Sequence, residues 1–295
     1  MWYIISMRLT RMKMITVLFA EYQKKRKGKD SVLALLDDVE IAERVYNSNA
    51  IENSTLTLPE TEKILLQQET ERRITLREIY EAKNLANVYA YIKKRALEQS
   101  LTIETILLLH KMLLTNIRDD VAGRFRKDDE MVQVGGHIGL PPQFIEKRIQ
   151  EALIRYSAET TTPFIQRIGS FHAEFESIHP FIDGNGRIGR VVNNYFLIRE
   201  GFPPIIVRNK GKEKYYAALR RYDDSHDGTS MIRIVELAVL ESLHKRLAYL
   251  EGKEIIPLST YKDAKQTSFH ALLNSARRQT IPAFREKGVW KIGKD

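Results

Sequence analysis

The feature that most constrains this 295-residue chain is a polar twelve-residue run, 179–190, between two segments with helical periodicity. Upstream, apolar residues recur at helical spacing and predict a helix with one buried face: Phe164, Ile168, Phe171, Phe175 and Ile178. Downstream, a second apolar series ends before Gly201, Pro203 and Pro204, as a helix C-terminus should: Ile188, Val191, Val192, Tyr195, Phe196 and Ile198. The run is therefore expected to be a loop that leads into a helix N-terminus.

The run itself reads His-Pro-Phe-Ile-Asp-Gly-Asn-Gly-Arg-Ile-Gly-Arg and suits a metal-bound polyphosphate with a base beside it. Unpaired backbone N–H groups at a helix N-terminus attract anions, and glycines let the backbone approach a phosphate closely. Arg187 and Arg190 lie one turn apart on the same helix face. Asp183 supplies the hard oxygen that Mg²⁺ prefers, and His179 can act as a base near neutral pH.

Two other loop types are excluded by spacing. An EF-hand loop that starts at Asp183 needs a glutamate at its twelfth position, where this chain has Asn194. A P-loop needs a Gly-Lys-Ser/Thr sequence, which the run lacks. An ordinary solvated loop is the remaining alternative, and the two converging helices disfavour it.

The run matches the Fic family signature at every defined position, and residues 40–240 resemble a Fic protein. The resemblance implies a mainly helical core and, most often, transfer of AMP from ATP to a protein hydroxyl. It implies that His179 is the catalytic base and that Asp183 is the Mg²⁺ ligand. It implies that the other motif residues bind the ATP phosphates or anchor the loop: Gly184, Asn185 and Gly186 as the anion cradle, Arg187 and Arg190 at the outer phosphates, and Phe181 as the core anchor.

A second motif lies at residues 48–53, Ser-Asn-Ala-Ile-Glu-Asn, near the end of a helix expected to start at about Asp37. Ser48 and Glu52 share a helix face, and a glutamate at a helix C-terminus opposes the dipole unless a cation pairs with it. The segment resembles the inhibitory motif of Fic proteins, which ends in Glu followed by Gly or Asn, here Asn53. The resemblance implies that Glu52 pairs with Arg190 and occupies the place of the γ-phosphate. A solvated helix end is the alternative.

Residues 131–140 are short, contain glycines and alternate Val132 with Val134, which predicts a small hairpin. The resemblance implies that this hairpin is a flap on which an extended segment of a target protein docks by strand addition. A plain surface loop is the alternative interpretation.

The composition is ordinary for a globular protein, with 43% hydrophobic and 29% charged residues. The absence of cysteine excludes disulfides and thiolate metal sites. No apolar run approaches the length of a membrane span, so no membrane partner is expected. The apolar stretch 14–20 lacks a cleavage pattern, so residues 1–30 are expected to be an N-terminal extension of a cytoplasmic protein.

The C-terminal residues 257–295 carry an excess of five positive charges out of the formal +9 of the chain. Helices after Ser259 and after Thr267 or Ser268 are expected, followed by strands over 281–285 and 289–292 around a Glu-Lys-Gly turn. This layout resembles an excisionase-like winged helix and implies duplex DNA as a partner. A helical cap with a solvated basic face is the alternative.

We therefore expect a mainly α fold: a helical Fic core with a short β-hairpin flap, and a small C-terminal winged helix-turn-helix-like domain. The expected boundaries are 1–30 for the extension, 31–250 for the Fic domain with its inhibitory helix, 251–256 for a linker and 257–295 for the last domain. Segments with helical periodicity are 76–99, 103–115, 143–159, 164–178, 187–200, 212–222 and 231–250.

The expected activity is that of a protein adenylyltransferase, a nucleotidyltransferase that moves AMP from Mg²⁺-ATP to a Ser, Thr or Tyr hydroxyl and is inhibited by Glu52. Two alternatives stay open. The same site could remove AMP from a target, with Glu52 orienting water, or the chain could be a nucleotide-sensing, DNA-bound regulator with little turnover. The target, the preferred donor and the oligomeric state, including a homodimer, are left open by the sequence.

Overall fold

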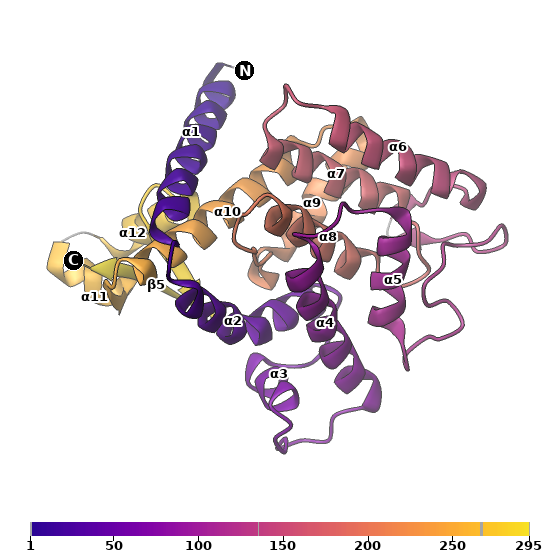
Figure 1. Cartoon of the computed structure of the whole chain (residues 1–295), viewed down its shortest axis with the longest axis horizontal. Coiled ribbons are helices and arrows are strands. Elements are labelled where there is room, and N and C mark those ends of the chain that lie inside the picture. The colour runs from indigo at the N-terminus through magenta and orange to yellow at the C-terminus, as the bar shows by residue number, and fades with distance from the viewer. Residues whose placement is uncertain (1, 135, 266–267, 295) are drawn as a thin grey trace. The chain divides into compact units, whose positions relative to one another are not determined.

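The computed structural model describes residues 2–134, 136–265 and 268–294, and this part of the chain is mainly α-helical (Figure 1). The expected helical core is therefore confirmed. Every segment with helical periodicity forms a helix: α4 Leu76–Arg95, α5 Ile103–Leu114, α6 Ile145–Ala158, α7 Phe164–Ile178, α8 Asn185–Arg199, α9 Lys212–Ser225 and α10 Thr229–Leu250. Gly135 of the expected hairpin and Thr267, one of the two expected helix caps, lie outside the described residues.

The N-terminal part differs from the sequence expectation. Residues expected to form a loose or packed extension form helix α1, Trp2–Lys25, and helix α2, Asp30–Ile51, begins seven residues before Asp37. Helix α3, Leu58–Leu65, was not expected at all. It begins with a capping box in which the Thr57 side chain accepts from the backbone of Glu60, and the Glu60 side chain accepts from the backbone of Thr57. The capping box could be recognised in the sequence, but the helix has too few apolar residues to show helical spacing.

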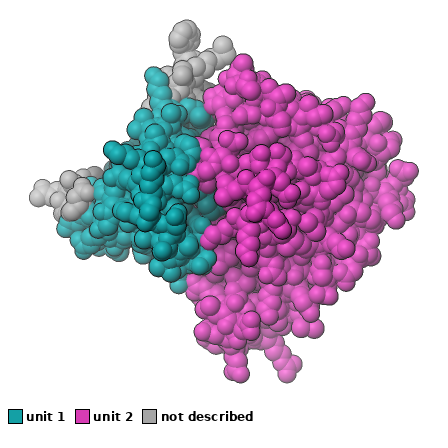
Figure 2. Space-filling model, viewed as in Figure 1, with its two compact units in different colours: residues 1–40, 203–205, 236–295 teal, residues 41–202, 206–235 magenta. Residues whose placement is uncertain are grey.

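Two compact units make up the chain (Figure 2). Unit 1 comprises Met1–Glu40, Pro203–Ile205 and Glu236–Asp295, and unit 2 comprises Ile41–Phe202 and Ile206–Val235. This division differs from the expected boundaries, because residues 1–40 and 236–250 group with the C-terminal elements. Ion pairs within unit 1 explain the grouping: Arg11 Nε lies 2.7 Å from Glu236 Oε2, and Arg246 Nη2 lies 2.6 Å from Glu40 Oε2.

Unit 2 is built around α7 and α8, which pack against each other and are surrounded by α4, α5, α6 and α9. The apolar residues that predicted the two helices line this core and are buried: Ile168, Phe171, Phe175, Ile178, Ile188, Val191, Val192, Tyr195 and Phe196. Aromatic contacts join the helices, for example between Phe171 and Phe196, whose ring centroids lie 5.2 Å apart. The loop 179–184 between α7 and α8 is thus held on a rigid pair of helices.

A short antiparallel hairpin precedes the 3₁₀ helix η1, Pro142–Phe144. Strand β1, Gln133–Val134, pairs with β2, His137–Ile138, in the register Gln133 with Ile138 and Val134 with His137. The expected hairpin is confirmed for the described residues. A second 3₁₀ helix, η2 Asn209–Gly211, leads into α9.

In unit 1 the last elements follow the order helix, strand, helix, helix, strand, strand. They are the end of α10, β3 Glu254–Pro257, α11 Leu258–Lys265, α12 Phe269–Arg278, β4 Ala283–Glu286 and β5 Val289–Lys294. The strands form an antiparallel sheet in the order β3-β5-β4 over a core of Leu258, Leu272, Ala276, Ala283 and Ile292. The expected two helices and hairpin are present. The expected linker 251–256 is instead partly β3, because residues 254–257 pair with 291–294 of β5.

Among the described residues, no helix is both long and apolar enough to cross a membrane.

Candidate active site

The polar run is a loop whose two ends are fixed by left-handed residues. Helix α7 ends at His179, which has φ 52° and ψ 61° and whose N–H donates to Phe175 O at 3.1 Å. Helix α8 begins after Gly184, which has φ 85° and closes the loop with a conformation that glycine adopts without strain. His179 therefore leaves the helix in a direction set by the backbone, close to the start of α8.

Buried side chains hold the loop from below. Phe181 is fully buried and stacks on His110 of α5, with ring centroids 3.7 Å apart and an angle of 8°. His110 Nδ1 accepts from Gly123 N at 3.0 Å, so Nε2 carries the proton and donates to Asp183 O at 3.0 Å. Phe181 thus fills the place expected of a core anchor.

The side chain of Asn185 is used inside the loop. Its Oδ1 accepts from Phe181 N and its Nδ2 donates to Phe181 O, both at 2.8 Å. Both polar atoms of the amide therefore hold the loop together. The backbone N–H groups at the N-terminus of α8 are the groups that could bind an anion here. A contribution of Asn185 to the anion cradle that the resemblance implies would therefore come from its backbone N–H, because Asn185 is the first residue of α8.

His179 lies half-buried above the loop. Its Nδ1 lies 3.3 Å from Glu176 O, and the Nδ1–H tautomer that suits this carbonyl places the lone pair on Nε2. Burial lowers the pKa of His179 to about 4, so the imidazole is neutral at neutral pH. A neutral imidazole with its lone pair on a defined nitrogen is able to accept a proton.

Arg126 was not identified from the sequence, yet it fixes both His179 and the hairpin. Its Nε donates to His179 O at 2.8 Å, its Nη1 to Glu130 O at 2.9 Å and its Nη2 to Leu140 O at 2.7 Å. Arg126 is buried, and one guanidinium group thus ties the loop to both ends of the segment 130–140. A lone arginine in a segment without helical or strand periodicity gives no motif signal, which is why Arg126 was missed.

Asp183 and Arg187 form an ion pair at the start of α8. Arg187 Nη2 lies 2.9 Å from Asp183 Oδ1, and Arg187 is buried while Asp183 is half-exposed. Mg²⁺ in nucleotide sites is commonly held by one or two carboxylates together with phosphate oxygens and water. The half-exposed carboxylate of Asp183, next to the N-terminus of α8, fits this set of ligands. Within the described residues, no cluster of three or more potential metal ligands offers an alternative site.

Arg190 is held by the end of helix α2. Its Nε donates to Ser48 Oγ at 3.0 Å, and its Nη2 donates to Ser48 O and to Glu52 Oε1, both at 2.8 Å. The Arg190 side chain is 3% exposed and that of Glu52 is 34% exposed. The Glu52–Arg190 pair that the resemblance implies is therefore present. The positive charge of Arg190 offsets the unfavourable position of a carboxylate at the C-terminus of α2.

Gly186 makes this pairing possible. A Cβ atom at Gly186 would collide with Glu52 Oε1 and lie 2.9 Å from Arg190 Nη1. The carboxylate of Glu52 thus lies directly over the backbone of Gly186, on the first turn of α8. A phosphate oxygen bound to this turn would meet the carboxylate of Glu52.

Helix α9 supports the end of α2. Asn53 has φ 67°, a left-handed conformation that Asn and Gly tolerate best at a helix C-terminus, and its Oδ1 accepts from Lys212 Nζ at 2.6 Å. Tyr216 OH donates to Ile51 O at 2.8 Å. The left-handed backbone conformation at position 53 therefore explains why this chain has Asn directly after Glu52.

Four buried residues around Arg190 were not identified as residues of the site from the sequence. Tyr215 OH lies 3.5 Å from Arg190 Nη1, 2.7 Å from His172 Nε2 and 3.4 Å from Glu176 Oε1. Burial raises the pKa of Glu176 to about 8 and lowers that of His172 to about 3, so both side chains are mainly neutral at neutral pH. Gly189 leaves room for them, because a Cβ there would lie 2.5 Å from Glu176 Oε1. His172 and Glu176 are one turn apart on α7, a spacing that could have drawn attention to them.

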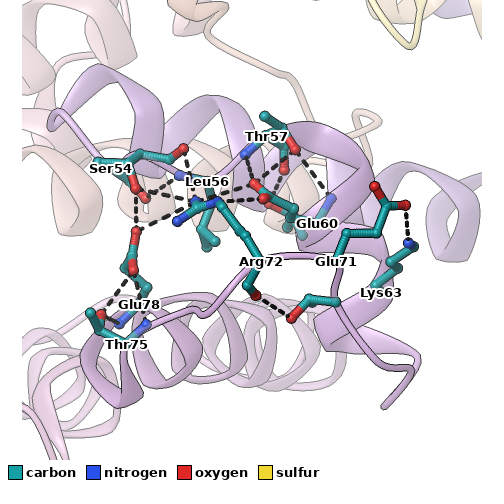
Figure 3. Close-up of polar contacts among 12 residues, drawn as sticks. Ser54, Leu56, Thr57, Glu60, Lys63, Glu71, Arg72, Thr75 and Glu78 are labelled. Atoms are coloured by element: carbon teal, nitrogen blue, oxygen red, sulfur yellow. Dashed lines mark hydrogen bonds and ion pairs between the residues drawn. The ribbon is translucent and has the colours of Figure 1, made fainter.

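A polar network follows the end of α2 and connects it to α4 (Figure 3). Arg72 Nε lies 2.5 Å from Glu60 Oε1, and Arg72 Nη2 donates to Thr55 O at 3.3 Å. Glu78, which caps α4 together with Thr75, also accepts from Thr55 Oγ1. We call Thr55, Glu60, Arg72 and Glu78 the Arg72 clamp; it fixes the chain directly after Glu52.

Comparison with known proteins finds a matching family and relatives with similar sequences. Residues 100–197 match the sequence model of the Fic/DOC family. A protein adenylyltransferase Fic of Nematostella vectensis is 30% identical over 233 residues, which cover 77% of this chain and 53% of that protein. The protein of the same name from Drosophila melanogaster is 29% identical over 257 residues, which cover 83% and 51%. The chain thus spans about half the length of these curated relatives.

Solved structures share the fold. A Fic domain containing signaling protein from Bacteroides thetaiotaomicron superposes with a TM-score of 0.73 at 24% identity, covering 81% of this chain and 97% of that one. Fic-1 from C. elegans gives a TM-score of 0.67 at 23% identity, covering 82% and 72%. The solved structures show that the fold is shared, and the match to the family model shows that residues 100–197 carry a domain of the Fic/DOC family.

Proposed function

We propose that this chain is a protein adenylyltransferase, which transfers AMP from ATP to a Ser, Thr or Tyr hydroxyl of a protein. One observation carries the proposal: a neutral His179 with its lone pair on Nε2 lies beside a helix N-terminus that bears Arg187 and Arg190. A base next to an anion-binding turn is what a hydroxyl needs to attack a phosphate ester. The names of the curated relatives support the same activity.

In this proposal His179 Nε2 accepts the proton of the target hydroxyl as its oxygen attacks the α-phosphorus of ATP. The new bond joins that oxygen to phosphorus, and the bond from phosphorus to the oxygen that bridges the α- and β-phosphates breaks. Pyrophosphate leaves with the electron pair. Backbone N–H groups at the start of α8, with Arg187 and Arg190, bind the phosphates and stabilise the charge that develops.

Asp183 is the residue that would hold Mg²⁺ in this site. When bound, the ion would neutralise charge on the phosphates of ATP. The ion pair between Asp183 and Arg187 keeps the carboxylate at the edge of the loop, next to the proposed phosphate position.

The hairpin 131–140 is proposed to dock an extended segment of the target protein by strand addition. Arg126 supports this role, because it joins Leu140 O and Glu130 O to His179 O. A target strand added to the hairpin would therefore be registered relative to the base. Recognition through the backbone tolerates varied target sequences.

Glu52 is proposed to inhibit the transfer. It shares Arg190 Nη2 with Ser48 O and lies over Gly186, where the γ-phosphate would be bound. ATP that cannot reach Arg190 would bind with its α-phosphorus out of line for attack.

A second candidate function concerns unit 1. The order of its last elements and the sheet order β3-β5-β4 are those of a winged helix, and α12 ends in the exposed Arg277 and Arg278. We propose that α12 contacts duplex DNA. The hairpin β4–β5 is a weaker candidate contact than α12, because Arg285 Nη2 lies 2.6 Å from Glu241 Oε2 and Lys291 Nζ lies 2.7 Å from Glu286 Oε2.

The proposed transfer is tested by incubating the full-length chain with ATP labelled on the α-phosphate and a cell lysate, then locating the label on proteins. Label on a hydroxyl residue that depends on His179 supports the proposal. If a pre-labelled target instead loses AMP, and the loss requires Glu52, the site works in the direction of removal. If ATP binds but no label moves in either direction, the site is a nucleotide sensor.

A further inference from the structure

We propose that Arg77, at the start of α4, is a further positioning residue of the phosphate site and contacts the β-phosphate of the bound nucleotide. The inference rests on the proposed function. Arg77 lies outside the signature run 179–190 and outside the inhibitory segment 48–53.

The first argument is that Arg77 and Arg187 share one carboxylate. Arg77 Nη2 lies 3.4 Å from Asp183 Oδ2, while Arg187 Nη2 lies 2.9 Å from Asp183 Oδ1. Two guanidinium groups from different helices thus hold the two oxygens of Asp183. A phosphate bound next to Asp183 and Arg187 is therefore within reach of Arg77 as well.

Glu81, one turn further along α4, fixes the position of Arg77. Arg77 Nε lies 3.1 Å from Glu81 Oε1, and Arg187 Nη1 lies 3.7 Å from the same oxygen. Because the ion pair with Glu81 uses the Nε side of Arg77, its Nη2 group points to Asp183. The guanidinium is thus oriented before any ligand arrives, which lowers the entropy cost of contact with a phosphate.

Exposure distinguishes the two arginines. The Arg77 side chain is 59% exposed, whereas that of Arg187 is 4% exposed. Arg187 can therefore serve as the fixed floor of the site, and Arg77 covers the phosphate from the solvent side. Arg77 is reachable by a ligand that enters from solution.

Charge gives the remaining argument. Asp183 and Glu81 neutralise Arg77 and Arg187 as a group of four. If the carboxylate of Asp183 binds a cation, it no longer neutralises Arg77. A negatively charged phosphate can then pair with Arg77. Hydrogen bonds between guanidinium and phosphate are among the stronger ones in proteins.

The test uses calorimetric titration of the full-length chain with ADP in the presence of Mg²⁺, and with AMP. ADP carries a β-phosphate but no γ-phosphate, so its binding does not require Glu52 to leave Arg190. Arg77→Gln is expected to weaken ADP binding about tenfold, the effect of one charged hydrogen bond, and to leave AMP binding unchanged. Arg77→Lys should recover part of the affinity.

The matched control is Arg73→Gln, which removes the same charge from an exposed residue on the loop before α4 and should bind ADP like the wild type. Unchanged ADP binding by Arg77→Gln, or an equal loss for AMP and ADP, would overturn the assignment of Arg77. A wild-type chain that binds neither ATP nor ADP would overturn the proposed function together with the inference. A wild type that binds both nucleotides, with Arg77→Gln unaffected, would refute the inference alone.

Discussion

Arg190 donates hydrogen bonds to the carboxylate of Glu52, to the backbone carbonyl and hydroxyl of Ser48 and to the hydroxyl of Tyr215. An arginine buried this deeply needs a carboxylate close by, and Glu52 is the only carboxylate among the described residues to which a hydrogen bond from it is seen. Its burial therefore depends on the contact that is proposed to inhibit the site. Substitutions at single positions can separate the structural role of this contact from its proposed inhibitory role.

Glu52→Gly is expected to raise AMP transfer, including self-modification, by about 10-fold to 100-fold, because Arg190 becomes available to the γ-phosphate and the α-phosphorus can align for attack. The measurement is the initial rate of labelling with ATP labelled on the α-phosphate. Glu69→Gly, which removes an exposed acid outside the site, is the control and should label like the wild type. Equal labelling by Glu52→Gly and wild type would contradict the inhibitory role.

His179→Ala is expected to abolish transfer in the Glu52→Gly background while leaving ATP affinity nearly unchanged, because in the proposed mechanism the imidazole accepts a proton and binds no phosphate. Labelling and calorimetric titration with ATP are compared for the same protein. His226→Ala, an exposed histidine at the end of α9, is the matched control. Full transfer activity without His179 would remove it as the base.

The raised pKa of Glu176 makes stability depend on pH. The folded chain holds the proton of Glu176 up to a pH of about 8, whereas the unfolded chain loses it near 4.5, so the folded state binds more protons between these values. The contribution of Glu176 to stability therefore falls as the pH rises from about 4.5 to about 8. Across this range the free energy of unfolding should change by an amount on the order of a few kcal/mol that depends on Glu176. Glu176→Gln should remove this change in urea unfolding measured from pH 5 to pH 9. An unchanged slope would show that Glu176 is ionised in the folded chain.

At the scale of elements, the Arg72 clamp gives the end of α2 a second support beside α9. The clamp joins the segment directly after Glu52 to the first turns of α3 and α4, with Thr57 and Thr75 capping those helices (Figure 3). Arg72 and Thr55 are exposed and Glu60 and Glu78 are partly exposed, so screening by solvent limits the contribution of the clamp to global stability. Its proposed importance is local, because it restricts where the α2 terminus can move.

Arg72→Ala is expected to raise transfer by a small factor, well below the effect of Glu52→Gly, and to leave the melting temperature nearly unchanged. The reason is that Thr55 and Glu60 lose their shared partner and the segment after Glu52 gains freedom. Initial labelling rates and thermal melts of Arg72→Ala and Arg73→Ala give the comparison. If both variants label like the wild type, the clamp plays no part in holding Glu52.

Helices α4 to α10 and the signature loop were predictable from sequence because each rests on a local pattern: apolar residues at helical spacing, and a run of polar residues with glycines. The contact between Glu52 and Arg190 was implied only by resemblance, since 138 residues separate the partners. Arg77, Arg126 and Tyr215 could not be predicted, because their roles come from tertiary packing that no spacing encodes. Strand β3 was missed because its partner, β5, lies more than thirty residues away.

At the scale of the whole molecule, the C-terminal elements share unit 1 with α1 and the end of α10. His244 of α10 lies 2.8 Å from Gln279 Oε1, and Arg285 pairs with Glu241 of α10. Truncation after Leu250 would therefore expose buried residues of α10 and is a poor test of DNA binding. Point substitutions on the exposed face of α12 avoid this problem.

Arg277→Ala with Arg278→Ala is expected to weaken binding to duplex DNA by about tenfold or more, and to reduce the slope of log affinity against log salt by about two, because each arginine that contacts a phosphate releases counterions. Titrations at two salt concentrations measure both quantities. Lys210→Ala, in the 3₁₀ helix η2 of unit 2, is the charge control. Absent binding, or binding that is insensitive to salt and to these substitutions, would leave α12 as a surface for a protein partner.

The position of Glu52 over Gly186 has a consequence for how such a chain would respond to its surroundings. A carboxylate tethered in the same polypeptide acts as a built-in competitor, and its effective concentration is set by the fold instead of by the amount of protein. Dilution would therefore not relieve the block, and ATP would have to displace a ligand that never diffuses away. A partner that moves the end of α2 away by a few ångströms would change the site from the proposed inhibited state to the active state in a single step, without any covalent change.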